Sequence, residues 1–125
     1  MASSVKEMLA EANAAVPRIS PEEAKALVGR DDVLFVDVRD SAELQAGKVK
    51  GAVHVSRGLL EFKADPEAPT HDKAFDRNKT IITYCASGGR SALAGKTLKD
   101  LGYTKVRNLG GFKDWVEAGG EVEKG

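Results

Sequence analysis

The chain has 125 residues, the usual size of one compact domain, which leaves little room for a second. Its 19 Lys and Arg residues balance its 19 Asp and Glu residues, so we expect neither nucleic acid nor an anionic membrane as a partner. The single cysteine, Cys85, excludes an internal disulfide, and with only 2 histidines a closed Cys/His zinc site is not expected.

The start of the chain does not have the pattern of a targeting segment. Lys6 and Glu7 interrupt any apolar region of a signal peptide. No apolar run approaches the roughly 18 residues that a membrane-spanning helix needs. Because a lone free thiol suits a reducing compartment, the sequence predicts a cytoplasmic protein.

The first predicted element is an amphipathic helix over residues 4–14, which Pro17 ends. We therefore expect an N-terminal helical extension, residues 1–16, followed by a single domain, residues 17–125. The apolar residues that recur at helical spacing are Val5, Met8, Leu9 and Ala12.

Residues 20–23, Ser-Pro-Glu-Glu, have the form of a capping box with proline at the first helical position. They predict a second helix that runs to about Val28 and ends at Gly29 in a left-handed conformation. A short strand at residues 18–19 can precede this helix.

The remaining chain alternates between short apolar runs and helical segments. Residues 33–36, Val-Leu-Phe-Val, are typical of a strand covered on both faces of a parallel sheet. The alternation predicts an α/β domain with a mainly parallel sheet, and the polar residues 64–79 predict a mobile loop. Further strands are expected over residues 52–55, 80–84 and 105–109, and helices over residues 41–46, 58–63, 91–101 and from Gly110-Gly111 onward.

Cys85 stands at the end of a predicted strand and begins the segment Cys-Ala-Ser-Gly-Gly-Arg-Ser, residues 85–91. Ligand sites of open α/β sheets lie at this edge, and the N–H groups of such a turn form an anion-binding nest at a helix N-terminus. Gly88 and Gly89 allow the backbone to approach a ligand closely, and Arg90 adds a permanent positive charge.

These features predict a lowered pKa for the Cys85 thiol. A free thiol with a pKa of about 8.5 is only about 3% ionised at pH 7, and lowering the pKa by two units needs about 2.7 kcal/mol. A helix terminus supplies about 0.3–1 kcal/mol, so hydrogen bonds in the turn and Arg90 have to supply the rest. The alternative is an inert buried cysteine, which the polar turn that follows Cys85 disfavours.

Two further motifs flank the cysteine segment, one on each side, and together the three resemble the rhodanese family over roughly residues 17–120. The front motif comprises residues 36–43, Val-Asp-Val-Arg-Asp-Ser-Ala-Glu, and 47–55, Gly-Lys-Val-Lys-Gly-Ala-Val-His-Val; the back motif comprises Leu101-Gly102-Tyr103, Leu109-Gly110-Gly111-Phe112 and Trp115.

The resemblance implies a three-layer domain with a five-stranded, mainly parallel sheet and helices on both faces. It also implies that Cys85 becomes a persulfide and that the loop amides hold the sulfane sulfur and the incoming anion. The substrate-binding residues so implied are Ala86, Ser87, Gly88, Gly89 and Arg90. The sequence departs from the family pattern at Lys48 and Lys50, where His and Pro are frequent, and at Ala86, where many members have a larger or basic residue.

The activity that this resemblance implies is sulfur transfer. The Cys85 thiolate attacks the outer sulfur of thiosulfate or a related donor, and sulfite leaves. The persulfide then gives its sulfur to cyanide, to a small thiol or to a sulfur-accepting protein. No metal and no organic cofactor are needed. Around the loop, we expect Asp37, Arg39 and Glu43 to pair with one another and Ser91 to cap the next helix.

Two other functions remain open from the sequence. Cysteine phosphatases also use a nest between a strand and a helix, but they usually place five residues between Cys and Arg, and here four separate Cys85 from Arg90. A non-catalytic sulfur carrier or protein-interaction module is the second alternative. Its contact surfaces would be the N-terminal helix and the loop of residues 64–79.

Overall fold

A computed structural model of the chain describes residues 3–125, so Met1 and Ala2, the first two positions of the expected N-terminal extension, lie outside the described residues. The helices are α1 (Val5–Ala15), α2 (Pro21–Lys25), α3 (Leu60–Ala64), α4 (Gly89–Asp100) and α5 (Phe112–Glu117), with short 3₁₀ helices η1 (Ser41–Ala46) and η2 (Arg57–Leu59). The strands are β1 (Val33–Asp37), β2 (Lys48–Val49), β3 (Val53–His54), β4 (Thr80–Cys85), β5 (Val106–Gly111) and β6 (Val122–Glu123).

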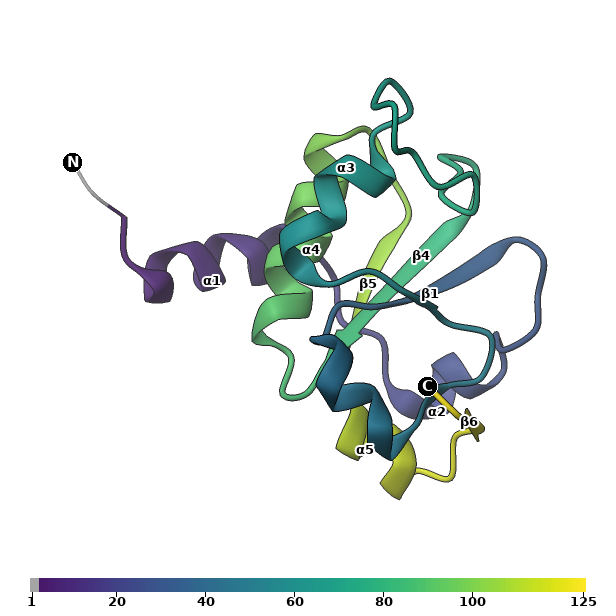
Figure 1. Cartoon of the computed structure of the whole chain (residues 1–125). Helices are drawn as coiled ribbons and strands as arrows, with labels where there is room; N and C mark the ends of the chain where they lie inside the picture. The colour runs from purple at the N-terminus through teal and green to yellow at the C-terminus, as the bar shows by residue number, and fades with distance from the viewer. Residues whose placement is uncertain (1–2) are drawn as a thin grey trace.

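The main sheet is parallel, with its strands in the order β3-β1-β4-β5. Helices cover both of its faces, which confirms the predicted α/β fold (Figure 1). Within the described residues this sheet has four strands and not the five that the resemblance implies, because the fifth position, beside β5, is reduced to one bridge between Arg18 and Asn108. Pro17 has no N–H to donate and the capping box begins at Ser20, so the segment between them has room for a single pair.

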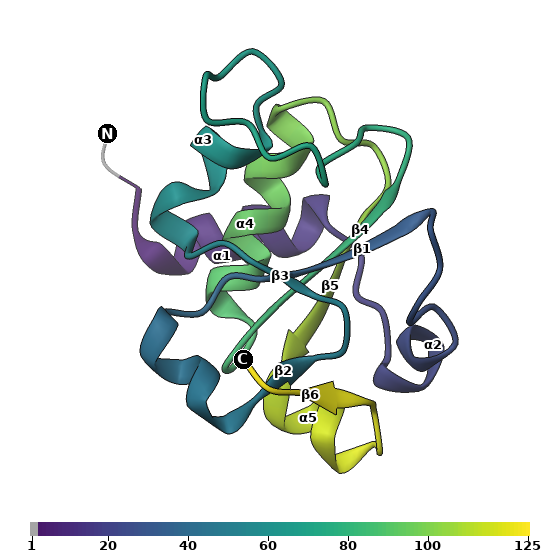
Figure 2. The same ribbon diagram turned by 45° about the vertical axis from the view of Figure 1, so that its right-hand side comes forward.

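Successive residues of the inner strands enter two different cores, as the pleat of a strand requires. Leu34 and Ile81 pack into the core beneath α1, α3 and α4, whereas Phe35 and Ile82 pack into the core beneath α2 and α5. Figure 2 shows the two groups of helices on opposite sides of the strands. Both faces of β1 and β4 are therefore covered, as their continuous apolar runs predict.

The predicted capping box of Ser20 and Glu23 opens α2. At the start of α1, the Ser4 side chain accepts a hydrogen bond from the N–H of Glu7, a cap that the sequence analysis did not predict. Helix α2 is shorter than expected, since its regular part ends at Lys25 and turns lead to Gly29, which has a φ of +83°.

Other boundaries differ from the prediction. Strand β5 runs on through Gly111, and α5 therefore starts at Phe112 instead of at the glycine pair. The small antiparallel sheet of β2 and β6 is absent from the prediction. Residues 65–79 form turns without helix or strand. None of the helices between residues 3 and 125 is long and apolar enough to cross a membrane.

Candidate active site

The chain turns sharply between the end of β4 and the start of α4, and Cys85 lies at the beginning of this turn. Gly88 has a φ of +104° and is the N-cap of α4. This positive φ, which favours glycine, reverses the chain early enough for Gly89 and Arg90 to be helical. The prediction that Ser91 caps the helix is therefore wrong: Ser91 is its third residue, and its hydroxyl donates to the Gly88 carbonyl at 3.1 Å.

The Cys85 sulfur lies inside this turn and has no exposed surface. The N–H of Gly88 donates to Sγ at 3.0 Å, and the Ser91 hydroxyl oxygen lies 3.5 Å from it. Burial by itself would raise the pKa of the thiol. Hydrogen bonds from Ser91 and from the backbone of Ser87 and Gly88 outweigh burial, so the pKa of Cys85 lies below its ordinary value.

The carboxyl end of β5 supports the Cys85 turn from behind. A Cβ on Gly111 would lie 2.5 Å from the carbonyl oxygen of Ala86, and a Cβ on Gly88 would lie 3.4 Å from Cα of Gly110. The two backbones thus touch directly. The pair Gly110-Gly111 is needed here because a side chain at Gly111 would push the turn away from the sheet.

Arg90 does not point freely into solvent, because Glu43 of η1 holds its guanidinium. The two nitrogens Nη1 and Nη2 donate to the two carboxylate oxygens at 2.7 and 3.0 Å. This bidentate pair lowers the pKa of Glu43 to about 2. Arg90 therefore ties the start of α4 to η1, and any anion in the turn would share it with Glu43.

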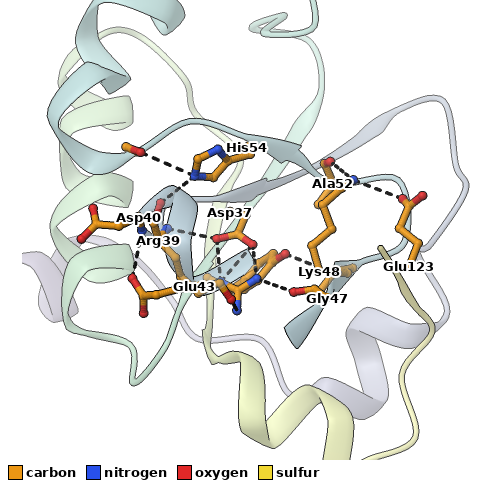
Figure 3. Close-up of polar contacts among 12 residues, drawn as sticks. Asp37, Arg39, Asp40, Glu43, Gly47, Lys48, Ala52, His54 and Glu123 are labelled. Carbon is orange, nitrogen blue, oxygen red and sulfur yellow. Dashed lines mark hydrogen bonds and ion pairs between the residues drawn. The ribbon is translucent and has the colours of Figure 1, made fainter. Parts of the chain in front are cut away.

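Asp37 and Arg39 form a buried ion pair, with Nη2 of Arg39 at 2.6 Å from Oδ2 of Asp37 (Figure 3). Arg39 also donates to the carbonyl oxygens of Glu43 and Gly47, and its guanidinium lies 4.4 Å from the ring centroid of Phe112. The expected pairing of Asp37, Arg39 and Glu43 is thus correct for the first two. The carboxylate of Glu43 turns instead to Arg90.

The site residues predicted from the sequence differ in their exposure to solvent. Ala86 and Ser87 form the exposed outer side of the turn, Gly89 and Arg90 are half-buried, and Cys85 and Gly88 are enclosed. Glu43 reaches this group through Arg90. Asp37 and Arg39 lie deeper, where they fix the backbone of η1.

The sequence reasoning missed Asn108, which is buried on β5 behind the turn and hydrogen-bonded to the Ser91 hydroxyl at 2.7 Å. A signal for it exists: in Val106-Arg107-Asn108 the first and third residues share one face, so an inward Val predicts an inward Asn. Within residues 3–125, no three His, Cys, Asp or Glu side chains are arranged to hold a metal ion.

The protein is an α/β domain with a parallel sheet. One inner strand of this sheet ends in a hydrogen-bonded cysteine, and a glycine turn and a helix follow it. These features define the class of α/β domains that have a cysteine in the loop after a central strand. Residues 20–118 match the rhodanese-like domain. The chain belongs to this family.

Three relatives show the range of proteins that carry this domain. The chain is 34% identical to a putative sulfur carrier protein, YrkF, of Bacillus subtilis over 81% of its own length and 51% of the relative's. It is 35% identical to a tRNA uridine(34) hydroxylase of Cytophaga hutchinsonii over 86% and 34%. It is 32% identical to the thiosulfate sulfurtransferase PspE of Escherichia coli over 64% and 71%. The chain thus spans about half or less of the first two.

Among solved structures, one from Rhodopseudomonas palustris superposes with a TM-score of 0.90 and is 41% identical over 98% of this chain and 96% of its own. It is a protein of unknown function that is described as a possible tyrosine phosphatase. The match extends beyond the rhodanese-like domain and leaves at most a few residues of the chain uncovered, so the solved structure shares most of the region before residue 20 as well.

Proposed function

We propose that the protein is a sulfurtransferase that carries a sulfane sulfur as a persulfide on Cys85. The observation that carries the proposal is the setting of Sγ at the edge where α/β sheets bind their ligands: the Gly88 N–H donates to it at 3.0 Å, and the Ser91 hydroxyl oxygen lies 3.5 Å from it. The Gly88 donor favours a thiolate, and hydrogen bonding with Ser91 also lowers the pKa of Cys85. A thiolate is the form of cysteine that attacks another sulfur.

In the first step, the Cys85 thiolate attacks the outer sulfur of an anionic donor such as thiosulfate. A sulfur–sulfur bond forms to Sγ while the bond inside the donor breaks, and the electron pair of the broken bond leaves with sulfite. The N–H groups of Ser87 and Gly88 point to the negative charge that remains on the cysteine. Ala86, Gly89 and Arg90 complete the surface that the donor meets.

In the second step, a thiolate acceptor attacks the outer sulfur of the persulfide, and Cys85 leaves as a thiolate ready for another cycle. Cyanide would accept the same sulfur and become thiocyanate. No metal and no organic cofactor enter either step. A free thiol in this role fits a reducing compartment, and we extend the proposal to a cytoplasmic location.

The test is the mass of the protein after incubation with thiosulfate. We expect a gain of one sulfur atom, which cyanide removes. Cys85→Ser should gain none, and because the chain has one cysteine the assignment has no ambiguity. An unchanged wild-type mass with thiosulfate, and with a glutathione persulfide donor, would refute sulfur transfer through Cys85.

A cysteine phosphatase is the second candidate, and the description of the solved Rhodopseudomonas palustris structure favours including it. Against it, Nη1 and Nη2 of Arg90 are both engaged by Glu43, whereas a phosphate needs donors directed into the loop. Hydrolysis of an aryl phosphate that Cys85→Ser abolishes would reverse this choice.

A sulfur carrier would show the first step without catalytic turnover. Comparing the rate of transfer to a small thiol with the rate of persulfide formation separates carrier from enzyme. Steady turnover with thiosulfate and glutathione indicates the enzyme. Loading that small thiols cannot discharge indicates a carrier that needs a protein acceptor, and then α1 and residues 65–79 are the surfaces to test.

A further inference from the structure

Arg18 is an exposed residue at the edge of the main sheet that the proposed sulfur transfer does not use. Its backbone pairs with Asn108 of β5 in the single bridge beside that strand. Its side chain reaches from there to Gly110: a Cβ on Gly110 would lie 2.5 Å from Nη2 of Arg18 and 3.3 Å from Cζ. The guanidinium therefore lies beside the carboxyl end of β5, in the space that a side chain on Gly110 would fill.

Gly110 also borders the Cys85 turn. Its Cα lies 3.4 Å from the position that a Cβ on Gly88 would take, and the Gly88 N–H donates to Sγ of Cys85 at 3.0 Å. A single glycine thus separates the Arg18 guanidinium from the residue that bonds the sulfur. Solvent ions screen a charge over this range only in part, because the Debye length is about 10 Å at 0.1 M salt and about 30 Å at 0.01 M.

The charges on the η1 side of the turn do not attract an anion. Arg90 is paired with Glu43, and its Nη1 also lies 3.9 Å from Oδ2 of Asp40. The buried pair of Asp37 and Arg39 is neutral as a whole. The carboxylates on this side therefore outnumber the guanidinium groups by one, so a negatively charged donor gains nothing by approaching from η1.

Arg18 has no counter-ion of this kind. Among residues 3–125 no carboxylate pairs with it, and its guanidinium donates no hydrogen bond. Lys113, the next cation after β5, is paired with Glu117 at 3.9 Å. An exposed guanidinium in this state can offer two parallel N–H donors to an oxyanion. The β5 side of the turn thus has the positive charge that the η1 side lacks.

We propose that Arg18 is a specificity-determining residue for Cys85: its guanidinium attracts negatively charged reagents to the β5 side of the turn and so selects anionic sulfur donors over neutral ones. The inference deepens the proposed sulfur transfer and rests on it for its purpose. It also explains how an anion is drawn to the sulfur although Glu43 engages Arg90. Such an effect acts on the rate of encounter and grows with the charge of the reagent.

The experiment measures the rates at which iodoacetate, an anion, and iodoacetamide, its neutral analogue, alkylate Cys85 at low reagent concentration and low ionic strength. The chain has one cysteine, so the gain in mass assigns each reaction without ambiguity. The ratio of the two rate constants is the quantity to compare, because the thiolate fraction and the opening of the turn affect both reagents alike.

We expect Arg18→Gln to lower the ratio of iodoacetate to iodoacetamide about two- to fourfold, since a single exposed charge acts here across solvent. Arg18→Lys, which keeps the charge, should retain most of the wild-type ratio, and Arg18→Glu should lower the ratio further than Arg18→Gln. Lys105→Gln is the matched control, because it removes a positive charge just before the amino end of β5 and should leave the ratio unchanged. At about 1 M salt, where the Debye length is about 3 Å, the effect of Arg18→Gln should disappear.

An unchanged ratio in Arg18→Gln would overturn the inference, and so would an equal fall in Lys105→Gln, which would indicate an effect of net charge alone. Arg18→Met replaces Arg18→Gln if the latter does not fold, with the same criteria.

Thiosulfate, a dianion, extends the series of reagents. Its loading rate in Arg18→Gln should fall by about the square of the factor found with iodoacetate, because twice the charge meets the same field. A loading rate equal to that of wild type would overturn the selection of anionic donors. Alkylation needs no sulfur donor, so a wild-type protein that gains no sulfur would refute sulfur transfer and leave the alkylation result for Arg18 standing.

Discussion

At the scale of single residues, Glu43 is the side chain that couples η1 to the Cys85 turn. Its carboxylate accepts two hydrogen bonds from Arg90, and it also accepts one from the N–H of Asp40 at 2.9 Å. Each of these bonds requires the ionised form. The pair with Arg90 is only partly exposed, at 32% for Glu43 and 36% for Arg90, so solvent weakens it without removing it.

Glu43 should make the stability of the protein depend on pH. The pKa of its carboxyl is about 2 in the folded protein, against 4.5 as the ordinary value. A lowered pKa means that the stabilisation is present above about pH 4.5 and is lost as the pH falls towards about 2. We expect Glu43→Gln to be less stable than wild type at pH 7, by about 1 kcal/mol after allowance for solvent screening.

Urea unfolding of both proteins at several pH values measures this difference. The gap between them should close as the pH falls below 4.5. Glu121→Gln, which removes an exposed pair with Lys50, is the matched control and should show no such pH dependence. A gap that stays constant to low pH would show that Glu43 acts by packing alone.

Sequence reasoning at this scale identifies residues by their neighbours along the chain. It found Cys85, Gly88 and Arg90, which lie in one segment. It did not find that Glu43 pairs with Arg90 and not with Arg39, because 47 positions separate the two partners and only the fold brings them together. For Asn108, the strand pattern indicates an inward side chain, but its partner Ser91 lies 17 positions away and is brought close only by the fold.

At the scale of elements, the main contact behind the candidate site is between the end of β5 and the turn after β4. Cys85 is paired with Gly111 and Tyr84 with Gly110, and the register shifts by one residue just before these pairs. A register shift of this kind bends a strand locally. Here it brings two glycines under the turn, where the backbones touch.

We expect Gly111→Ala to displace the Cys85 turn, since the new methyl group would lie 2.5 Å from a backbone oxygen that has no flexible side chain to move. The cost should be about 1–3 kcal/mol in the free energy of unfolding, with loss of persulfide formation. Gly58→Ala is the matched control, because no atom lies within 4 Å of its new Cβ. Mass spectrometry and urea unfolding check both variants; a Gly111→Ala protein with wild-type loading would show that the turn tolerates the displacement.

Elements with local signals were predicted well. Apolar residues at helical spacing predicted α1, the capping box predicted the start of α2, and the β-branched apolar runs predicted β1 and β4. Strands β2 and β6 were missed because each has two residues and their pairing joins positions far apart, Lys48 with Glu123 and Val49 with Val122. Nothing in either segment by itself favours a strand.

At the scale of the whole molecule, the Asp37–Arg39 pair holds the loops after β1 against the core beneath α5. Asp37 has no exposed surface and Arg39 has 3%. The guanidinium bonds the carbonyl of Gly47 at 2.7 Å and faces Phe112, so it joins the sheet, η1 and α5. The division into an extension, residues 1–16, and a domain, residues 17–125, stays a prediction.

Removal of the Asp37 charge should weaken the entire fold. Asp37→Asn leaves Arg39 as a buried charge without a counter-ion, which destabilises proteins by about 3–5 kcal/mol. We expect a single cooperative urea transition at a much lower midpoint. Asp32→Asn breaks the exposed pair with Arg30 and should leave the midpoint unchanged. Equal, small effects of both substitutions would contradict the central role of the buried pair.

In the proposed sulfur transfer, the enclosure of the Cys85 sulfur has a kinetic consequence. A nucleophile without any open surface meets its partner only after the turn that covers it moves, so encounter and bond formation become separate events. At low donor concentration the rate of persulfide formation is limited by collisions between donor and protein. At high concentration the rate is limited by the opening of the turn, and it reaches a maximum that is the same for every small donor. Larger reagents need a wider and rarer opening, so the covering turn acts as a filter on molecular size.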